Sequence, residues 1–351
     1  MLYHTQNPHG GDVYDGEIQL DFSANTNPYG TPQPALDAMS AVLTRVHQYP
    51  DPYCRELVKA ISEFESVRKE WILCGSGAAE LIYSYCEALR PQKAMELAPT
   101  FSEYSLALER AGCRVELYPL KKEHSFSLTE DFLPVLESSR PDVLFLCNPN
   151  NPTGQVIEKS LLEQILSLCE RKGIFLFVDE CFLDLTEGGE GLTLKDRLGQ
   201  NENLLLLKAF TKSYGMAGLR LGCCLSGNAR LLLAMSRDTQ AWNVSIPAQA
   251  AGAAALKEQA FLERARNIIF DQRPRMAAAM ESLGLTVIPS RANFLLFYSE
   301  KELYAPLLAR GIQLRSCDNF PGLGRGWYRA AVKLPEENRI LLSAMEEILH
   351  G

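Results

Sequence analysis

A lysine follows a strongly apolar run in the stretch LLLLKAFTKSYGMAGLRLGCCL, residues 204–225. Lys212 comes just after the run, two glycines follow, and Arg220 stands eight residues beyond the lysine. A lysine amine at such a place can form a Schiff base with a carbonyl compound, and an arginine nearby can neutralise a bound anion. A single lysine is more commonly a surface charge, so this interpretation depends on the residues that accompany it.

A glycine turn precedes an amphipathic segment in CGSGAAEL, residues 74–81. If a helix begins there, Gly77 supplies the turn, and the free N–H groups of Ala78 and Ala79 can hold a phosphate with the help of the helix dipole. An ordinary glycine-rich turn has the same appearance.

Two polar residues follow predicted buried strands. Asn151 lies in NPNNPTG, residues 148–154, and Asp179 follows five apolar residues in IFLFVDECF, residues 174–182. A carboxylate at the end of a buried strand needs a cation or strong donors. Seen alone, the asparagine fits a plain loop and the aspartate fits a cap of the next loop.

Together these residues match what pyridoxal 5'-phosphate requires. The cofactor needs a lysine for its aldehyde, an acid beside its ring nitrogen, and arginine and helix N–H groups for its phosphate. The combination therefore predicts Lys212 as the Schiff-base residue, Asp179 as the acidic partner and Arg220 as a phosphate ligand.

The elements that carry these residues are predicted from alternating patterns. Short β-rich runs alternate with amphipathic segments, which indicates β-α-β units around a mostly parallel sheet. The clearest strands are expected at 142–147, 174–180, 203–210 and 220–226. A helix is expected over 160–173, with Ser160 and Glu163 as a capping box and Gly173 as terminator.

The pattern changes after about residue 245, where long Ala-rich helices are followed by several strands and a last helix from Pro335. The sequence therefore predicts an α/β protein with a large domain and a smaller α+β domain. We expect residues 1–43 to form an N-terminal arm and part of the small domain, residues 44–245 the large cofactor-binding domain, and residues 246–351 the small domain.

Composition excludes several classes of function. The 351 residues include 35 Lys and Arg against 43 Asp and Glu, a net charge of −8 without a long basic block, so neither nucleic acid nor an anionic membrane is an expected partner. No signal peptide or membrane-spanning run is evident, so we expect a cytoplasmic protein. Six of the ten cysteines lie in apolar runs and no C-x-x-C pair occurs, which favours reduced core residues over disulfides or a metal site.

Over essentially its whole length the chain resembles the class I and II aminotransferase superfamily, the fold-type I pyridoxal-phosphate enzymes. The resemblance implies that Lys212 carries the cofactor, Asp179 pairs with the pyridinium, and Asn151 binds the 3' oxygen. It places Phe101, in APTFSEY, against the cofactor ring and Arg329, in WYRAAV, on the substrate α-carboxylate. The implied phosphate ligands are Arg220, Gly77, Ala78, Ala79 and, less directly, Thr211.

The resemblance also implies a homodimer, because Tyr49 in HQYPDP matches a tyrosine that reaches the neighbouring subunit's cofactor. One position departs from the superfamily pattern. Ala209 stands where a serine or threonine commonly contacts the phosphate, so one hydroxyl ligand is missing and weaker cofactor retention is expected.

Within the superfamily, the chain is similar to the branch of histidinol-phosphate aminotransferases and L-threonine-O-3-phosphate decarboxylases. HGG at 9–11, DFSANTNP at 21–28, the segment from Leu314, and a phenylalanine at Phe182, where aminotransferases usually have tyrosine, favour the decarboxylases. This implies a phosphorylated amino-acid substrate, with candidate ligands His9, Asn27, Arg315 and Arg329. The expected reaction releases CO2 from L-threonine O-3-phosphate to give (R)-1-amino-2-propanol O-2-phosphate for cobalamin biosynthesis. L-serine O-phosphate as substrate, and transamination of histidinol phosphate or an aromatic amino acid, remain the alternatives.

Overall fold

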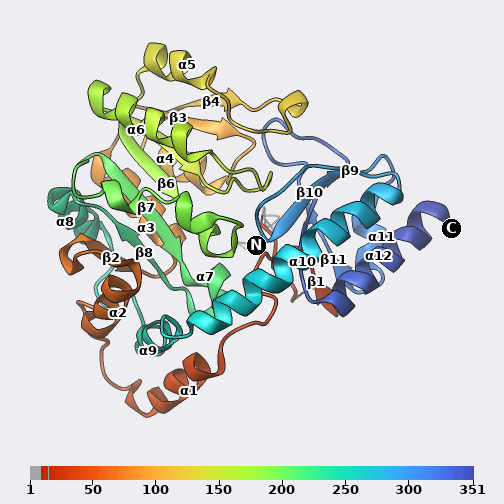
Figure 1. Cartoon of the computed structure of the whole chain (residues 1–351). Coiled ribbons are helices and arrows are strands. Elements are labelled where there is room, and N and C mark those ends of the chain that lie inside the picture. The colour runs from red at the N-terminus through yellow and green to blue at the C-terminus, as the bar shows by residue number, and fades with distance from the viewer. Residues whose placement is uncertain (1–8, 15) are drawn as a thin grey trace, which may run out of the picture.

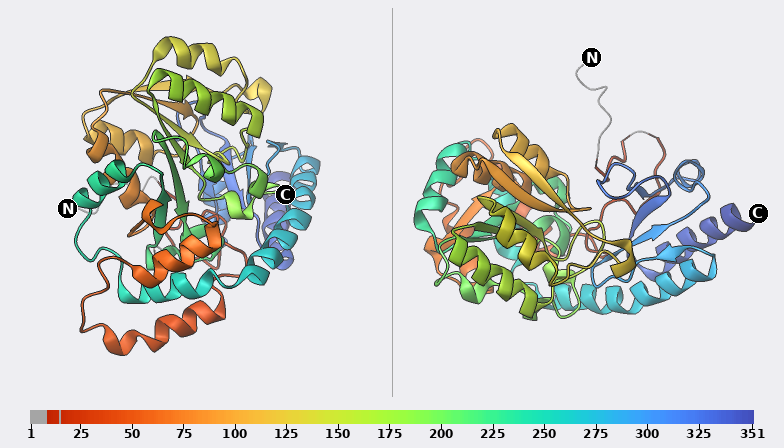
Figure 2. Two further views of the ribbon diagram at one scale, coloured as in Figure 1. Left: turned by 60° about the vertical axis from the view of Figure 1, so that its left-hand side comes forward. Right: turned by 90° about the horizontal axis from the view of Figure 1, so that it is seen from above.

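The computed structural model describes residues 9–14 and 16–351, so residues 1–8 and Asp15 of the predicted arm lie outside the described part. A seven-stranded sheet forms the larger body and a four-stranded antiparallel sheet the smaller one (Figure 1). The long helix α10 runs from the larger body to the smaller (Figure 2).

The large sheet has the order β2-β8-β7-β6-β5-β3-β4, and only β8 is antiparallel to its neighbours. Because β5 and most of β6 and β7 are buried on both faces, they read as continuous apolar runs. The strands are β2 Ile72–Gly75, β3 Lys93–Ala98, β4 Arg114–Pro119, β5 Val143–Cys147, β6 Phe175–Asp179, β7 Leu204–Ala209 and β8 Gly222–Leu225.

Two apolar layers cover this sheet. One contains residues of α3, α4 and α8, and the other contains residues of α2, α5, α6 and α9, because alternate strand residues point to opposite faces. The helices are α1 Gln33–Ala41, α2 Arg55–Glu65, α3 Ala78–Leu89, α4 Glu103–Arg110, α5 Phe132–Ser139, α6 Lys159–Lys172, α7 Phe210–Ser213, α8 Ala229–Asp238 and α9 Ile246–Ala255. Single 3-10 turns lie at Leu43–Arg45, Lys69–Trp71, Lys122–His124, Leu183–Leu185, Gly189–Gly191, Lys195–Arg197 and Ala217–Leu219.

The small sheet has the order β12-β13-β10-β9 and packs on α10 and α12. The arm joins this body through β1, which pairs in parallel with β11. The elements are β1 Leu20–Asp21, α10 Gln259–Ser282, β9 Thr286–Val287, β10 Phe294–Tyr298, α11 Tyr304–Leu308, β11 Ile312–Gln313, β12 Arg315–Ser316, β13 Trp327–Ala331 and α12 Pro335–His350.

The predicted α/β class, the mostly parallel sheet and the four clearest strands are confirmed. The predicted helix over 160–173 is observed as α6, and it ends at Gly173 in a left-handed conformation with φ of 69°. The capping box predicted for this helix was wrong, because α6 begins at Lys159 without a side-chain cap. Glu163 instead accepts a hydrogen bond from Arg197 at 2.6 Å. The predicted domain boundaries stay a prediction.

None of the helices in the described part of the chain is long and apolar enough to cross a membrane. All ten cysteines are described, buried and free of disulfide bonds.

Candidate active site

A cavity of about 380 Å³ lies at the sheet edge where β5, β6 and β7 end. Ligands bind at this edge in open α/β sheets because loops and helix N-termini converge there. Most of the residues predicted from the sequence line the cavity, namely His9, Ala78, Ala79, Phe101, Asn151, Asp179, Thr211, Lys212, Arg220, Arg315 and Arg329.

The turn between β2 and α3 forms one wall. Gly77 has φ of 84°, and a Cβ there would lie 2.7 Å from Arg220 Nη2. A Cβ on Gly222 would lie 2.8 Å from the backbone nitrogen of Ala78. The two glycines therefore let the guanidinium and the start of α3 approach each other, which concentrates positive charge for an anion.

Lys212 enters the cavity from the short helix α7. Burial lowers the pKa of Lys212 to about 8, the positive charges of Arg329 and Arg220 act in the same direction, and Asp179 opposes them. The backbone around Lys212 is held in place, since its carbonyl accepts from the backbone N–H of Asn27 at 2.9 Å. An amine with this pKa is partly neutral near pH 7 to 8, as a nucleophile or a base requires.

Asp179 ends β6 and is 5% exposed. Burial raises the pKa of its carboxyl group, while hydrogen bonds to the carboxylate oppose the rise. Oδ2 accepts from the Tyr104 hydroxyl at 2.6 Å, and Oδ1 accepts from the backbone N–H of Cys181 at 2.9 Å. These donors favour the ionised form at the floor of the cavity.

Phe101 precedes α4 and lies between two partners. Its ring centroid is 5.6 Å from that of Tyr104, edge to face, and 5.9 Å from that of His9. His9 Nε2 lies 2.8 Å from Glu103 Oε1, so a side chain of the arm meets α4 at the cavity.

Arg329 on β13 reaches the cavity from the small body. Its Nη1 donates to Asn151 Oδ1 and its Nη2 donates to the Ser23 carbonyl at 2.7 Å. Burial lowers the pKa of Arg329 to about 10, so it keeps its charge at neutral pH. In the described part of the chain no carboxylate forms an ion pair with this guanidinium, so a buried cation stands ready for an anionic ligand.

Arg315 supplies a further cation. Its Nη2 donates to Asn319 Oδ1 at 2.8 Å, and the guanidinium lies 5.1 Å from the ring centroid of Phe320. Burial lowers the pKa of Arg315, and both Arg315 and Phe320 line the cavity.

Three predicted residues do not line the cavity. Gly77 lies against the guanidinium of Arg220 and is not among the lining residues. Asn27 supports the lysine turn, since its Nδ2 donates to the Ser213 carbonyl at 2.8 Å. Tyr49 is 76% exposed and stacks on Trp242 with a centroid separation of 4.3 Å.

The sequence interpretation missed Tyr104, Glu103, Ser23 and Phe320. Tyr104 was open to prediction, because it stands three residues after Phe101 and α4 begins between them. Ser23 acts through its carbonyl, so its residue type carried no signal.

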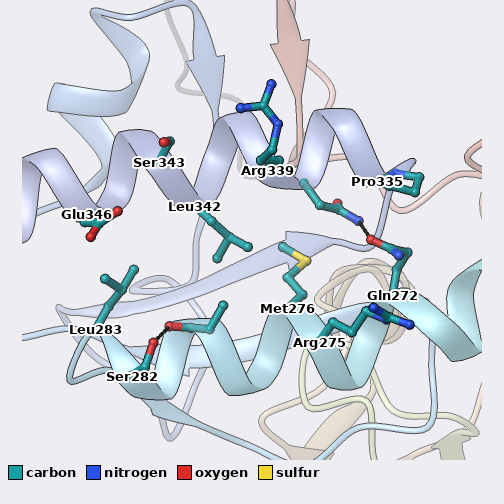
Figure 3. Close-up of a pocket in the computed structure, with 12 residues that line it drawn as sticks. Gln272, Arg275, Met276, Ser282, Leu283, Pro335, Arg339, Leu342, Ser343 and Glu346 are labelled. Carbon is teal, nitrogen blue, oxygen red and sulfur yellow. Dashed lines mark hydrogen bonds between the residues drawn. The ribbon is translucent and has the colours of Figure 1, made fainter.

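A second hollow of about 380 Å³ lies between α10 and α12 (Figure 3). Arg275 and Arg339 line it, and each pairs with a carboxylate on its own helix, Asp271 and Glu336 respectively. This hollow does not combine a nucleophile, a buried acid and cations in the way that the cavity around Lys212 does.

Comparisons with known proteins agree with this geometry. Residues 17–345 match the family model described as aminotransferase class I and II. The chain is 35% identical to threonine-phosphate decarboxylase of Salmonella typhimurium, over 98% of this chain and 97% of that protein. It is 33% identical to a histidinol-phosphate aminotransferase of Desulfitobacterium hafniense, over 95% of this chain and 92% of that protein.

The solved histidinol-phosphate aminotransferase of Clostridium acetobutylicum superposes with a TM-score of 0.88 at 27% identity, over 94% of this chain and 99% of that one. Both enzyme types anticipated from the sequence are therefore among its relatives. The chain belongs to the aminotransferase class I and II family, whose members depend on pyridoxal 5'-phosphate.

Proposed function

We propose that this protein is a pyridoxal-phosphate-dependent carboxy-lyase that converts L-threonine O-3-phosphate to (R)-1-amino-2-propanol O-2-phosphate and CO2, a step of cobalamin biosynthesis. The observation that carries the proposal is the presence of three arginines around Lys212, namely Arg220, Arg315 and Arg329. Three cations can neutralise three anionic groups, the cofactor phosphate, the substrate phosphate and the substrate carboxylate.

The cavity fits the cofactor. The close approach of Arg220 to Gly77 and the start of α3 forms a cradle that a side chain at Gly77 would fill, which suits a phosphate. Across the cavity Asp179 offers a buried carboxylate for a ring nitrogen, and Phe101 offers an aromatic face. We assign the 3' oxygen to Asn151 and the aldehyde to Lys212.

When bound, pyridoxal phosphate supplies an electron sink for the bond that breaks at the substrate Cα. Asp179 would hold a proton on the ring nitrogen of the bound cofactor, because the hydroxyl of Tyr104 and the backbone N–H of Cys181 favour its ionised form. Arg329 holds the substrate carboxylate and so decides the direction in which that group points. Lys212, with a pKa of about 8, can give a proton to Cα after CO2 has left.

A second anion site distinguishes the proposed substrate from an unphosphorylated amino acid. We assign the substrate phosphate to Arg315 with His9, both of which line the cavity. Asn27, which the sequence predicted as a substrate ligand, acts on the site only indirectly, through its hydrogen bonds to the backbone of the lysine turn.

Transamination is the second candidate, and the similarity to histidinol-phosphate aminotransferases favours it. Both reactions use the same site, and the direction of the Cα–carboxylate bond selects between them. L-serine O-phosphate lacks one methyl group of the threonine substrate, and a methyl group gives only about 10- to 200-fold discrimination.

We also propose a homodimer in the cytoplasm. Tyr49 and Trp242 form a stacked pair that is largely exposed, at 76% and 46%, and Tyr53 nearby is 69% exposed. Such aromatic residues on a surface suit a protein partner, here a second copy whose cavity Tyr49 enters.

The deciding experiment incubates the cofactor-loaded protein with L-threonine O-3-phosphate in the absence of a keto acid. Release of CO2 together with the amine phosphate over many turnovers is the expected result, and L-serine O-phosphate is run in parallel to rank the two substrates. Absence of CO2, with amino transfer from histidinol phosphate to 2-oxoglutarate, would make the protein an aminotransferase.

A further inference from the structure

The guanidinium of Arg329 is held by neutral acceptors from separate segments. Besides Asn151 and the Ser23 carbonyl, the side chain of Asn25 faces it. With the Asn25 amide turned so that its oxygen faces the donors, this oxygen accepts from Nε at 3.1 Å and from Nη1 at 3.2 Å. The donor groups of arginine select this orientation, since the amide NH2 would face only other donors.

These contacts fix the direction of the guanidinium. They use four of the five N–H donors of an arginine, so a rotation would break several hydrogen bonds together. One N–H remains, and its direction is determined by the other four.

Asn25 is itself firmly placed behind Arg329. It is 1% exposed, it is not among the described residues that line the cavity, and its backbone carbonyl accepts from Asn293 Nδ2 at 3.1 Å. The arm is also tied to β13, because the Phe22 carbonyl accepts from the backbone N–H of Ala331 at 2.9 Å. Asn25 can therefore act on the substrate only through Arg329.

We propose that Asn25 is a positioning residue that aims Arg329 and thereby selects which bond of the substrate Cα breaks. The proposal rests on the proposed function, in which Arg329 binds the substrate carboxylate. An amide suits this position for a second reason. It supplies an acceptor for two N–H groups without a negative charge, so the guanidinium keeps its full attraction for an anion.

Two substitutions of Asn25 separate the effect of the orientation of Arg329 from the effect of charge beside it. Asn25→Leu removes the acceptor at similar volume, whereas Asn25→Asp keeps both contacts and adds a charge that competes with the substrate carboxylate. The experiment measures, in cofactor-loaded protein, CO2 release from L-threonine O-3-phosphate against amino transfer to 2-oxoglutarate. We expect Asn25→Leu to raise the share of amino transfer about tenfold or more. We expect Asn25→Asp to keep the wild-type share while KM rises about tenfold.

A binding measurement does not depend on turnover. Calorimetry compares 3-(phosphonooxy)butanoate, which lacks the reacting amine, with isopropyl phosphate, which also lacks the carboxylate. We expect Asn25→Asp to weaken binding of the first compound and leave the second unchanged. Equal affinity of wild type and Asn25→Asp for the carboxylate compound would contradict the charge part of the proposal.

Asn338→Leu is the matched control, because Asn338 is 2% exposed and its amide bonds lie within the small body, to the Lys333 carbonyl at 2.8 Å. It should cost stability without changing the share of amino transfer. If Asn25→Leu is folded and behaves like this control, the positioning role is wrong. Failure of the proposed function is a different outcome, in which the wild type itself releases no CO2, while the binding comparison still tests the charge part of the proposal.

Discussion

The hydroxyl of Tyr104 donates to Oδ2 of Asp179 at 2.6 Å, in a place where both side chains are buried. The phenol comes from α4 and the carboxylate from the end of β6, so the contact joins two elements that are far apart in the sequence. The contact opposes the rise in the pKa of Asp179 that burial causes, and so favours the ionised form that the proposed chemistry requires.

Replacement of Tyr104 by phenylalanine should raise the pKa of Asp179 and weaken its support of the cofactor ring. A hydrogen bond to a charged group contributes about 1.5 to 3 kcal/mol, so kcat should fall by about ten- to a hundredfold. The midpoint of a pH titration that follows the cofactor absorbance should shift in the variant that shows the lower kcat. Unchanged spectra with a lowered Tm would mean that Tyr104 only packs against its neighbours.

The pKa of Lys212 predicts how the stability of the cofactor-free protein depends on pH. Because the folded pKa of about 8 lies below the ordinary value of 10.5, the unfolded chain binds more protons between these pH values. Stability should therefore rise as pH increases from about 8 to about 10.5. Lys212→Met removes this dependence and should be more stable than wild type at pH 7, by at most about 3 kcal/mol. Denaturant unfolding of both proteins across this range measures the difference, and parallel stability curves would contradict it.

Ala209 lines the cavity at the end of β7 and precedes α7. Ala209→Ser should restore a hydroxyl for the cofactor phosphate and tighten cofactor binding by about 1 to 2 kcal/mol, or about 5- to 30-fold in Kd. Fluorescence titration of the cofactor-free protein measures the affinity. Ala209→Cys is the control of similar size, and an equal gain there would exclude the hydroxyl as the cause.

Tyr49 tests the homodimer directly, since it is exposed and lies outside its own chain's cavity. We expect Tyr49→Ala and Lys212→Ala each to be nearly inactive alone. Mixed after reversible dissociation, they should recover about a quarter of wild-type activity, because half of the dimers then carry one intact site. Ultracentrifugation checks the association state. No recovery in mixtures shown to contain hybrid dimers would rule out a contribution of Tyr49 to the neighbouring site.

Some site residues could be predicted from the sequence, because their residue type and their place at the end of a strand are enough to indicate their role. Lys212, Asp179, Asn151 and Arg220 follow apolar runs or glycine turns, and parallel strands bring such ends to one edge. The structure places all four around one cavity.

The sequence by itself thus determined the α/β class, four strands of the large sheet and the chemical type of the site, because hydrophobic periodicity and residue type are local properties. Only the tertiary structure decided how the side chains of Asp179 and Arg329 are oriented. The contacts of Asp179 with Tyr104 and of Arg329 with Asn25 join residues 75 and 304 positions apart, through packing that no local pattern encodes. For the same reason the capping role expected of Glu163 was lost to Arg197, since a distant cation competes successfully for a local partner.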